Sequence, residues 1–126
     1  MRVVLAVVAS LLLSVVSAQA ERVVPTGKPL ILRQVSATNP DCTSSGEVVM
    51  RVAQGPEHGR VSIRHTGIFA NFPQSNIRSA CNRRRVPGVE AIYVSERGYL
   101  GWDTVVLEAF GPAGRGMRYT IQIHVM

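Results

Sequence analysis

Apolar and polar side chains alternate with a period of two in several parts of this chain. In residues 60–65, Val61, Ile63 and His65 occupy every second position, with Arg or Ser between them. Residues 117–126 continue the pattern, with Tyr, Ile and Val alternating against Arg, Thr, Gln and His. Because successive side chains of a strand point to opposite faces, this pattern predicts strands with one buried face. No stretch of residues 21–126 has the period of an amphipathic helix, so we expect an all-β domain.

Turns rich in glycine and proline separate the predicted strands. Residues 55–59, Gly-Pro-Glu-His-Gly, lie between the predicted strands 47–54 and 60–65. Proline lacks a ladder donor and glycine permits positive φ, so these residues are expected to form the turn of a β-hairpin. A second such turn, residues 111–116, precedes the last strand. Strands that recur with turns between them favour an antiparallel β-sandwich of about seven strands.

The remaining segments complete this sandwich. Residues 21–28 are a short lead-in that is either an edge strand or loosely held, and residues 29–35 are a strand at a sheet edge. Residues 89–94 and 104–110 are strands, the second of them central. Residues 66–88 are expected to be irregular and to bury Phe69 and Phe72 in the core; a further strand near residues 67–71 is the alternative.

The turn Gly98-Tyr99-Leu100-Gly101-Trp102-Asp103 is expected to form a corner of the fold. Gly98 and Gly101 supply positive φ, and Asp103 is expected to accept hydrogen bonds from the turn's own amides. Trp102 is predicted to be a core residue, because a domain with so few aromatic side chains needs them for packing. The alternative is that Trp102 and Tyr99 form a platform on which a sugar ring stacks.

The first 20 residues have the pattern of a secretory signal peptide. Met1 and Arg2 give a basic start, residues 3–16 are almost wholly apolar, and Ala18 and Ala20 provide the small residues of a cleavage site before Glu21. A membrane anchor is the alternative, but the apolar run is shorter than the ~20 residues that cross a bilayer. We therefore divide the chain into a signal peptide, residues 1–20, and one exported domain, residues 21–126.

Both cysteines, Cys42 and Cys81, lie in the exported part. Thiols are oxidised outside the cytoplasm, so the two are predicted to form a disulfide. The loop of roughly 39 residues would constrain the unfolded chain by about 4 kcal/mol on the chain-entropy model. A metal site is the alternative, but neither cysteine has a second Cys or a His at ligand spacing.

Several short motifs together are typical of one kind of domain: residues 55–61 (Gly-Pro-Glu-His-Gly-Arg-Val), Tyr93, residues 98–103, Gly114 and residues 121–125. In these motifs the chain resembles the immunoglobulin-like and cadherin-like domains of secreted bacterial proteins. The resemblance implies an antiparallel immunoglobulin-like β-sandwich in which residues 98–103 turn the corner between the sheets. Calcium-binding members carry clustered acids, whereas this chain has only Asp41 and Asp103, far apart, so no calcium is expected.

The densest charge is the basic run Arg83, Arg84 and Arg85, with Arg78 just before it. The chain has a net charge of +6, which loss of Arg2 with the signal peptide lowers to +5. Guanidinium groups suit bidentate contacts with phosphate and carboxylate, so an acidic polysaccharide or a lipid surface is the expected partner. The alternative is a solvated loop that aids solubility. Export argues against a nucleic-acid partner.

Histidines and methionines suggest a metal site. His124 and Met126 share one strand face, and imidazole and thioether groups select copper, but Met117 belongs to the opposite face. His58 and His65 have no matching methionine beside them. No metal or other cofactor is therefore expected, and a periplasmic copper carrier stays an alternative.

No enzyme is expected, because the sequence has no Gly-x-Ser-x-Gly elbow and no evident nucleophile–base pair. The sequence thus predicts a monomeric, non-enzymatic binding or adaptor module of the bacterial periplasm or cell exterior, with residues 68–85 as its binding surface. Besides the copper carrier, the alternative is a structural or protein-interaction module that uses an open sheet edge.

Overall fold

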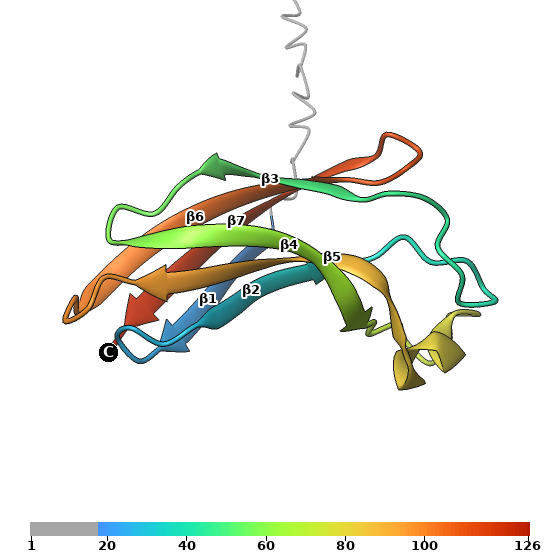
Figure 1. The fold of residues 1–126 in the computed structure, drawn as a ribbon, viewed down its shortest axis with the longest axis horizontal. Helices are drawn as coiled ribbons and strands as arrows, with labels where there is room; N and C mark the ends of the chain where they lie inside the picture. Colours follow the sequence, from blue (N-terminus) through green and yellow to red (C-terminus); the bar gives the residue numbers. More distant parts are fainter. Residues whose placement is uncertain (1–17) are drawn as a thin grey trace, which may run out of the picture.

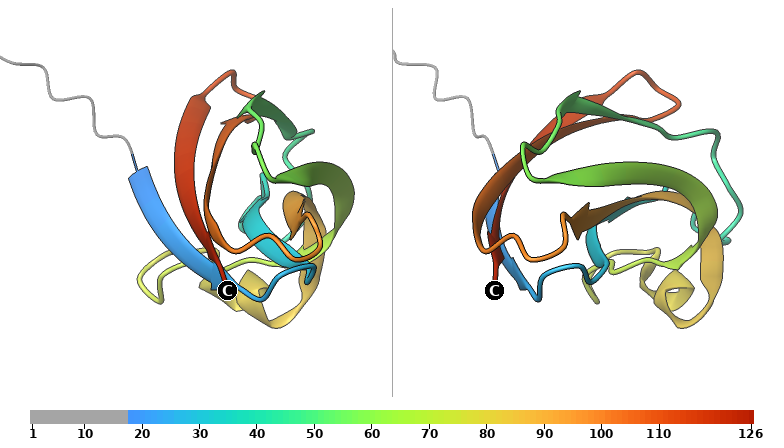
Figure 2. Two further views of the ribbon diagram at one scale, coloured as in Figure 1. Left: turned by 90° about the vertical axis from the view of Figure 1, so that its left-hand side faces the viewer. Right: turned by 60° about the vertical axis from the view of Figure 1, so that its left-hand side comes forward.

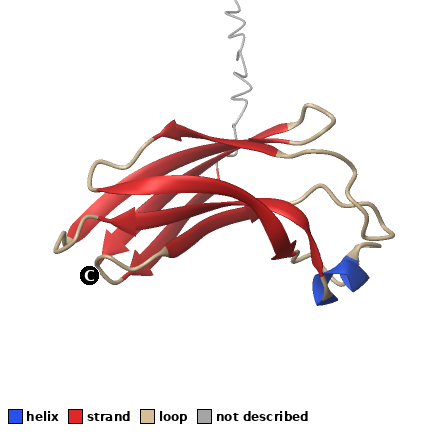
Figure 3. Ribbon diagram, viewed as in Figure 1, coloured by secondary structure: helices blue, strands red, loops and turns tan. Residues whose placement is uncertain are grey.

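The computed structural model describes residues 18–126, which form seven strands and one short 3-10 helix (Figure 1). The predicted all-β class is confirmed. The elements are β1 (Ala18–Val24), β2 (Leu30–Val35), β3 (Val49–Gln54), β4 (Gly59–Phe69), η1 (Ser79–Arg83), β5 (Arg85–Ser95), β6 (Gly101–Phe110) and β7 (Gly116–Val125). Loops and turns join the strands at both ends (Figure 3). No helix in the described part of the chain is long and apolar enough to cross a membrane.

The strands form two sheets that lie face to face (Figure 2). One sheet has four strands in the order β1-β7-β6-β3, and the other has three in the order β2-β5-β4. Neighbouring strands are antiparallel except β1, which runs parallel to β7. A mainly antiparallel sandwich follows from the alternation in the sequence, because each sheet has one apolar face to bury.

The core lies between the two sheets and is built from alternate residues of both. On β7, four of the five residues predicted to share the buried face are buried, whereas Met117 is 56% exposed at the start of the strand. On β6, Val105 and Leu107 are fully buried, as expected for a central strand. From β5, Val89, Ala91 and Tyr93 face them. Burial of these side chains is the main source of stability.

The predicted hairpin of residues 47–54 and 60–65 is wrong. β3 pairs with β6 in the four-stranded sheet, and β4 pairs with β5 in the other sheet. The residues between them therefore cross from one sheet to the other. The crossing is held by Asp103 of β6, whose carboxylate accepts hydrogen bonds from the backbone amides of Glu57 at 2.9 Å and His58 at 3.1 Å.

β4 and β5 form the longest hairpin, and it takes up part of the segment predicted to be irregular. Their pairing runs from Gly59 with Ser95 to Phe69 with Arg85. The alternative of a strand near residues 67–71 is thus correct up to Phe69. Phe69 itself is 53% exposed, contrary to expectation, because it ends the strand beyond the sandwich core, where the Arg85 guanidinium lies over its ring. Phe72 is half-buried against a small second core around Cys81.

The start of the domain is an edge strand. Residues 1–17 of the predicted signal peptide lie outside the described residues, and the predicted cleavage before Glu21 falls within β1, so that Glu21–Val24 would remain paired with β7. Arg22 donates hydrogen bonds to the carbonyl oxygens of Ile31 at 2.9 Å and Leu32 at 3.3 Å. These bonds join β1 of one sheet to β2, which is an edge strand of the other as predicted.

Glu90 is a buried acid on the outer face of the three-stranded sheet. It is 2% exposed, and its carboxylate accepts hydrogen bonds from Gln34 at 2.8 Å and from Arg64. The bond from Gln34, with smaller contributions from Arg64 and Arg85, holds the pKa of Glu90 below its usual range against the opposing effect of burial. A depressed pKa means that this carboxylate stabilises the fold above its unfolded-state pKa and that the contribution disappears as pH falls through the folded-state value.

We therefore expect the free energy of unfolding to decrease when the pH is lowered below about 4. This decrease should be smaller in Glu90→Gln than in the wild type. Urea denaturation between about pH 3 and pH 7 measures it. Glu57→Gln, at a highly exposed carboxylate, is the control and should keep the wild-type pH dependence. Equal acid dependence in Glu90→Gln and the wild type would contradict this role for Glu90.

Candidate anion-binding end of the sandwich

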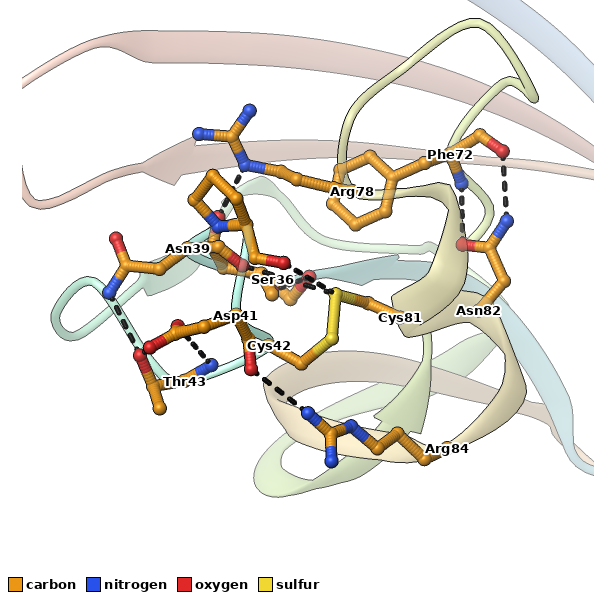
Figure 4. The surroundings of a disulfide bond; sticks show 12 residues. Ser36, Asn39, Asp41, Cys42, Thr43, Phe72, Arg78, Cys81, Asn82 and Arg84 are labelled. Carbon is orange, nitrogen blue, oxygen red and sulfur yellow. Dashed lines mark hydrogen bonds between the residues drawn. A yellow bond between two sulfur atoms is a disulfide. The ribbon is translucent and has the colours of Figure 1, made fainter.

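Two loops meet at one end of the sandwich, and the disulfide Cys42–Cys81 joins them (Figure 4). Cys42 lies in the loop between β2 and β3, and Cys81 lies in η1, with their Cα atoms 5.4 Å apart. The structure thus contains the predicted disulfide. Cys81 is fully buried and packs with Ile68 and Val86, which anchors η1 to the ends of β4 and β5. We call residues 36–46 together with residues 70–85 the arginine-rich end.

The loop that carries Cys42 is ordered by its own hydrogen bonds. The Asp41 carboxylate accepts bonds from the hydroxyl of Thr43 at 2.6 Å and from its backbone amide at 3.1 Å. The bond from the Thr43 hydroxyl is the main reason that the pKa of Asp41 is lowered, and the Arg84 charge contributes less. The backbone amide of Asn39 donates a hydrogen bond to the carbonyl oxygen of Thr43 at 2.8 Å, which closes the loop around Cys42.

Two of the four predicted site arginines hold the two loops together, and a third binds the neighbouring strand. Arg78 donates from Nε to the carbonyl oxygen of Thr38 at 2.6 Å, and Arg84 donates to that of Asp41 at 2.9 Å. Figure 4 shows these two side chains reaching the Cys42 loop on opposite sides of the disulfide. Arg85 donates to the carbonyl oxygen of Gly67 at 3.1 Å, on the neighbouring strand. Each guanidinium has five donors, so one such bond fixes the group and leaves other N–H groups for a ligand.

Arg83 differs from the other three. It is the last residue of η1 and is exposed, and within residues 18–126 its side chain makes no hydrogen bond or ion pair. The structure therefore gathers all four predicted arginines at one end of the sandwich, three as braces and one facing solvent.

Asn82 is a residue of this end whose role the sequence analysis missed. Its side chain accepts a hydrogen bond from the Phe72 amide at 2.9 Å and donates one to the Phe72 carbonyl at 2.8 Å. This pair of bonds joins the connection after β4 to η1 and provides hydrogen-bond partners for the main-chain N–H and C=O groups of Phe72. An asparagine beside a turn is a signal for such bonds, but its partner ten residues away is not evident from the sequence.

The electrostatic balance of the arginine-rich end is strongly positive. Its four arginines face one acid, Asp41, since residues 66–88 contain no Asp or Glu. Outside this end, three arginines are paired with acids: Arg51 and Arg118 both bind Glu108 at 2.8 Å, and Arg64 binds Glu90. The cross-linked loops therefore combine four arginines within residues 78–85 with a single acid.

The predicted corner, residues 98–103, lies at the opposite end of the sandwich. Gly98 and Gly101 have φ of 81° and 135°, so these positions require glycine as predicted. Asp103 does accept backbone hydrogen bonds, but they come from Glu57 and His58 of the crossing loop and from the adjacent Thr104 amide at 3.0 Å rather than from residues 98–102. It also accepts one from the Tyr93 hydroxyl at 2.8 Å, which raises the pKa of Tyr93 together with burial, the larger cause.

Trp102 is not a core residue. It is 53% exposed and stacks on His124, with ring centroids 4.5 Å apart. Its position explains this: Asp103 and Val105 point inward on β6, so Trp102 and Thr104 point outward. Tyr99 is half-buried, stacks on His58 at 3.9 Å and packs against the core.

The structure does not assemble the copper ligands that the sequence suggested. Met117 and His124 are seven residues apart on the extended strand β7, a separation of about 23 Å. His124 is also stacked on Trp102. Among residues 18–126, no three His, Cys, Asp or Glu side chains lie close enough together to hold a metal ion.

Comparison with known proteins gives little similarity. No protein-family model matches the chain. No curated protein matches it either. Among solved structures, the one described as "Solution Structure of Amebosin" aligns with 87% of this chain and 96% of its own chain, at 15% sequence identity and a TM-score of 0.40.

Proposed function

We propose that this protein is an exported, non-enzymatic binding module of the bacterial envelope, and that its arginine-rich end contacts an anionic polymer or lipid surface. The observation that carries the proposal is the geometry of the four arginines. They all lie in residues 78–85, a segment that the disulfide and the bonds of Arg78 and Arg84 tie to the Cys42 loop and that the bond of Arg85 ties to β4. Donors that are already ordered bind an anion at a lower entropic cost than those of a mobile loop.

Export is supported by two independent features. The first 20 residues have the signal-peptide pattern, and the disulfide is of the kind that persists in oxidising compartments. Cleavage before Glu21 would leave Arg22, which links β1 to β2, in the mature protein.

The strand order supports an immunoglobulin-like sandwich. In that fold one sheet contains strands C, F and G and the other contains B, E and D. Here β3, β6 and β7 are neighbours in one sheet, and β2, β5 and β4 are neighbours in the other, in the corresponding sequence positions. The disulfide is a departure, because it joins a loop to η1 rather than strand to strand. Immunoglobulin-like domains serve many functions, so the fold alone assigns none.

Binding to isolated bacterial envelopes is expected to be strong at low salt and lost at high salt. The Debye length falls from about 30 Å at 0.01 M ionic strength to about 3 Å at 1 M, which screens exposed charges. Co-sedimentation of the mature protein with envelopes at these two ionic strengths measures the effect. The variant Arg83→Ala/Arg84→Ala/Arg85→Ala should bind about tenfold more weakly, from about 0.5 kcal/mol for each exposed contact.

Thermal unfolding of the triple variant must accompany this measurement, because Arg84 also braces the Cys42 loop and Arg85 also binds β4. Arg97→Ala, at the opposite end of the sandwich, is the control for a general change of charge and should bind normally. Binding that is insensitive to salt and to the three arginines would reject the proposal. It would favour instead a protein partner that pairs with an edge strand such as β4.

A further inference from the structure

The outer face of the four-stranded sheet carries a row of apolar and aromatic side chains far from the arginine-rich end. Val23, His124 and Trp102 are partners on β1, β7 and β6 and therefore lie side by side across three strands. Val23 is 62% exposed and Trp102 is 53% exposed. The row lies at the end where the turn after β5 leads into β6, whereas η1 precedes β5 at the other end (Figure 1).

The Trp102 side chain is 53% exposed although one face of its indole is covered. His124 covers this face, with an angle of 9° between the two ring planes. Rings that stack between adjacent strands stand upright on the sheet, so the second indole face is directed toward the next strand. That strand is β3, but its pairing with β6 ends at Val106. β3 therefore does not pair beside Trp102, and we attribute the exposure of Trp102 to the edge of its ring and to the face opposite His124.

Trp102 is also held in position. Its carbonyl oxygen accepts a hydrogen bond from the Tyr99 hydroxyl at 2.6 Å, and the next residue, Asp103, is fixed by bonds to the crossing loop and to Tyr93. The main chain at Trp102 is therefore fixed and His124 supports one face of the ring, which reduces the entropic cost of stacking.

Hydrogen-bonding groups form the adjacent row on the same face. Glu21, Gln122 and Thr104 are partners across β1, β7 and β6, two residues from the aromatic row. The Thr104 hydroxyl donates to Oε1 of Gln122 at 2.8 Å, and within residues 18–126 the Gln122 Nε2 group donates to no protein acceptor. Glu21 is exposed and supplies an acceptor. The two rows contain no arginine or lysine.

We propose that these two rows bind a neutral saccharide chain, with one sugar ring stacked on the face of Trp102 opposite His124 and the hydroxyl groups of neighbouring rings bonded to Gln122 and Glu21. A pyranose ring has an apolar face of C–H groups and a rim of hydroxyls, so a saccharide chain can stack one ring on an aromatic side chain and direct the hydroxyls of other rings to an amide and a carboxylate. The carboxylate and the absence of basic groups disfavour an acidic polymer here. The site is thus separate in place and in ligand chemistry from the arginine-rich end.

Trp102 is the one tryptophan of the chain, so its fluorescence reports directly on the site. Titration with cellohexaose and with chitohexaose, two neutral β-1,4-linked probes, should change the emission of Trp102 and saturate. Calorimetry should show binding about tenfold weaker for Trp102→Ala, the factor that corresponds to about 1.4 kcal/mol. Trp102→Phe should keep part of the affinity, and high salt should leave it unchanged.

Leu100→Ala is the matched control, because Leu100 is an exposed apolar residue at the same end but outside both rows. It should bind the probes as the wild type does, and so should the triple arginine variant. If neither probe changes the emission at concentrations up to about 10 mM, the proposal is overturned, because a Kd above that concentration is too weak for binding to matter. The proposal would also be overturned if the emission changed with protein concentration but not with either probe. That result would show that a second copy of the chain covers this face.

Discussion

Asp103→Ala is expected to lower the free energy of unfolding by about 3–5 kcal/mol, a large part of the total for a domain of this size. Asp103 is 3% exposed, and its carboxylate accepts hydrogen bonds from Glu57, His58 and Tyr93. It thereby joins β6 of one sheet to β5 of the other and to the loop that crosses between them. Alanine would leave the buried Tyr93 hydroxyl and two amides without their acceptor, and urea denaturation measures the loss.

Tyr93→Phe provides the comparison, because it removes the hydroxyl and leaves the carboxylate bonded to the loop. It should cost about 1–2 kcal/mol, and the loss should shrink when Asp103 is already alanine. Fully additive losses in the double variant would show that the two residues act independently and would contradict this account of the crossing.

Removal of the disulfide is expected to lower the free energy of unfolding by about 4 kcal/mol. The chain-entropy model gives this value for a loop closed over a sequence separation of 39 residues. The variant Cys42→Ala/Cys81→Ala tests it by denaturant unfolding. Loss of the bridge should also loosen η1, because Cys81 anchors it to Ile68 and Val86.

Hydrogen exchange locates the effect. Amides of residues 36–46 and 78–84 should exchange faster in the variant, while those of β6 and β7 should lose protection only as global stability falls. An intact-mass measurement that finds two free thiols in the exported wild-type protein would remove the premise. Unchanged stability in the double variant would show that the arginine–carbonyl bonds suffice to join the loops.

Most strands could be predicted from the sequence, but their partners could not. The pattern around residues 55–59 correctly predicts two strands and a turn between them. The same pattern, however, is compatible both with a hairpin and with a crossing from one sheet to the other. What decides between them here is Asp103, which lies 46 residues from Glu57 in the sequence. A period of two shows which residues share a face, not which strand lies beside them.

Trp102 shows where the general preference of a residue type misled the prediction. Tryptophan is usually buried, but the alternation within β6 places Trp102 with Thr104 and Glu108, on the side opposite to Val105 and Leu107. The position in the pattern was therefore the better guide. At the arginine-rich end the arginines themselves were evident from the sequence. Their acceptors were not, because main-chain carbonyls such as that of Thr38 have no sequence signature.

The most direct test of the proposed function is a pair of charge reversals, Arg83→Glu and Arg97→Glu, compared in envelope co-sedimentation at low salt. Both residues are exposed; Arg83 ends η1, which precedes β5, and Arg97 lies in the turn after β5, so each reversal changes the net charge equally at opposite ends of the sandwich. The proposed function predicts that Arg83→Glu loses most of its binding while Arg97→Glu keeps it. Equal binding by the two variants would contradict the arginine-rich end as the contact surface.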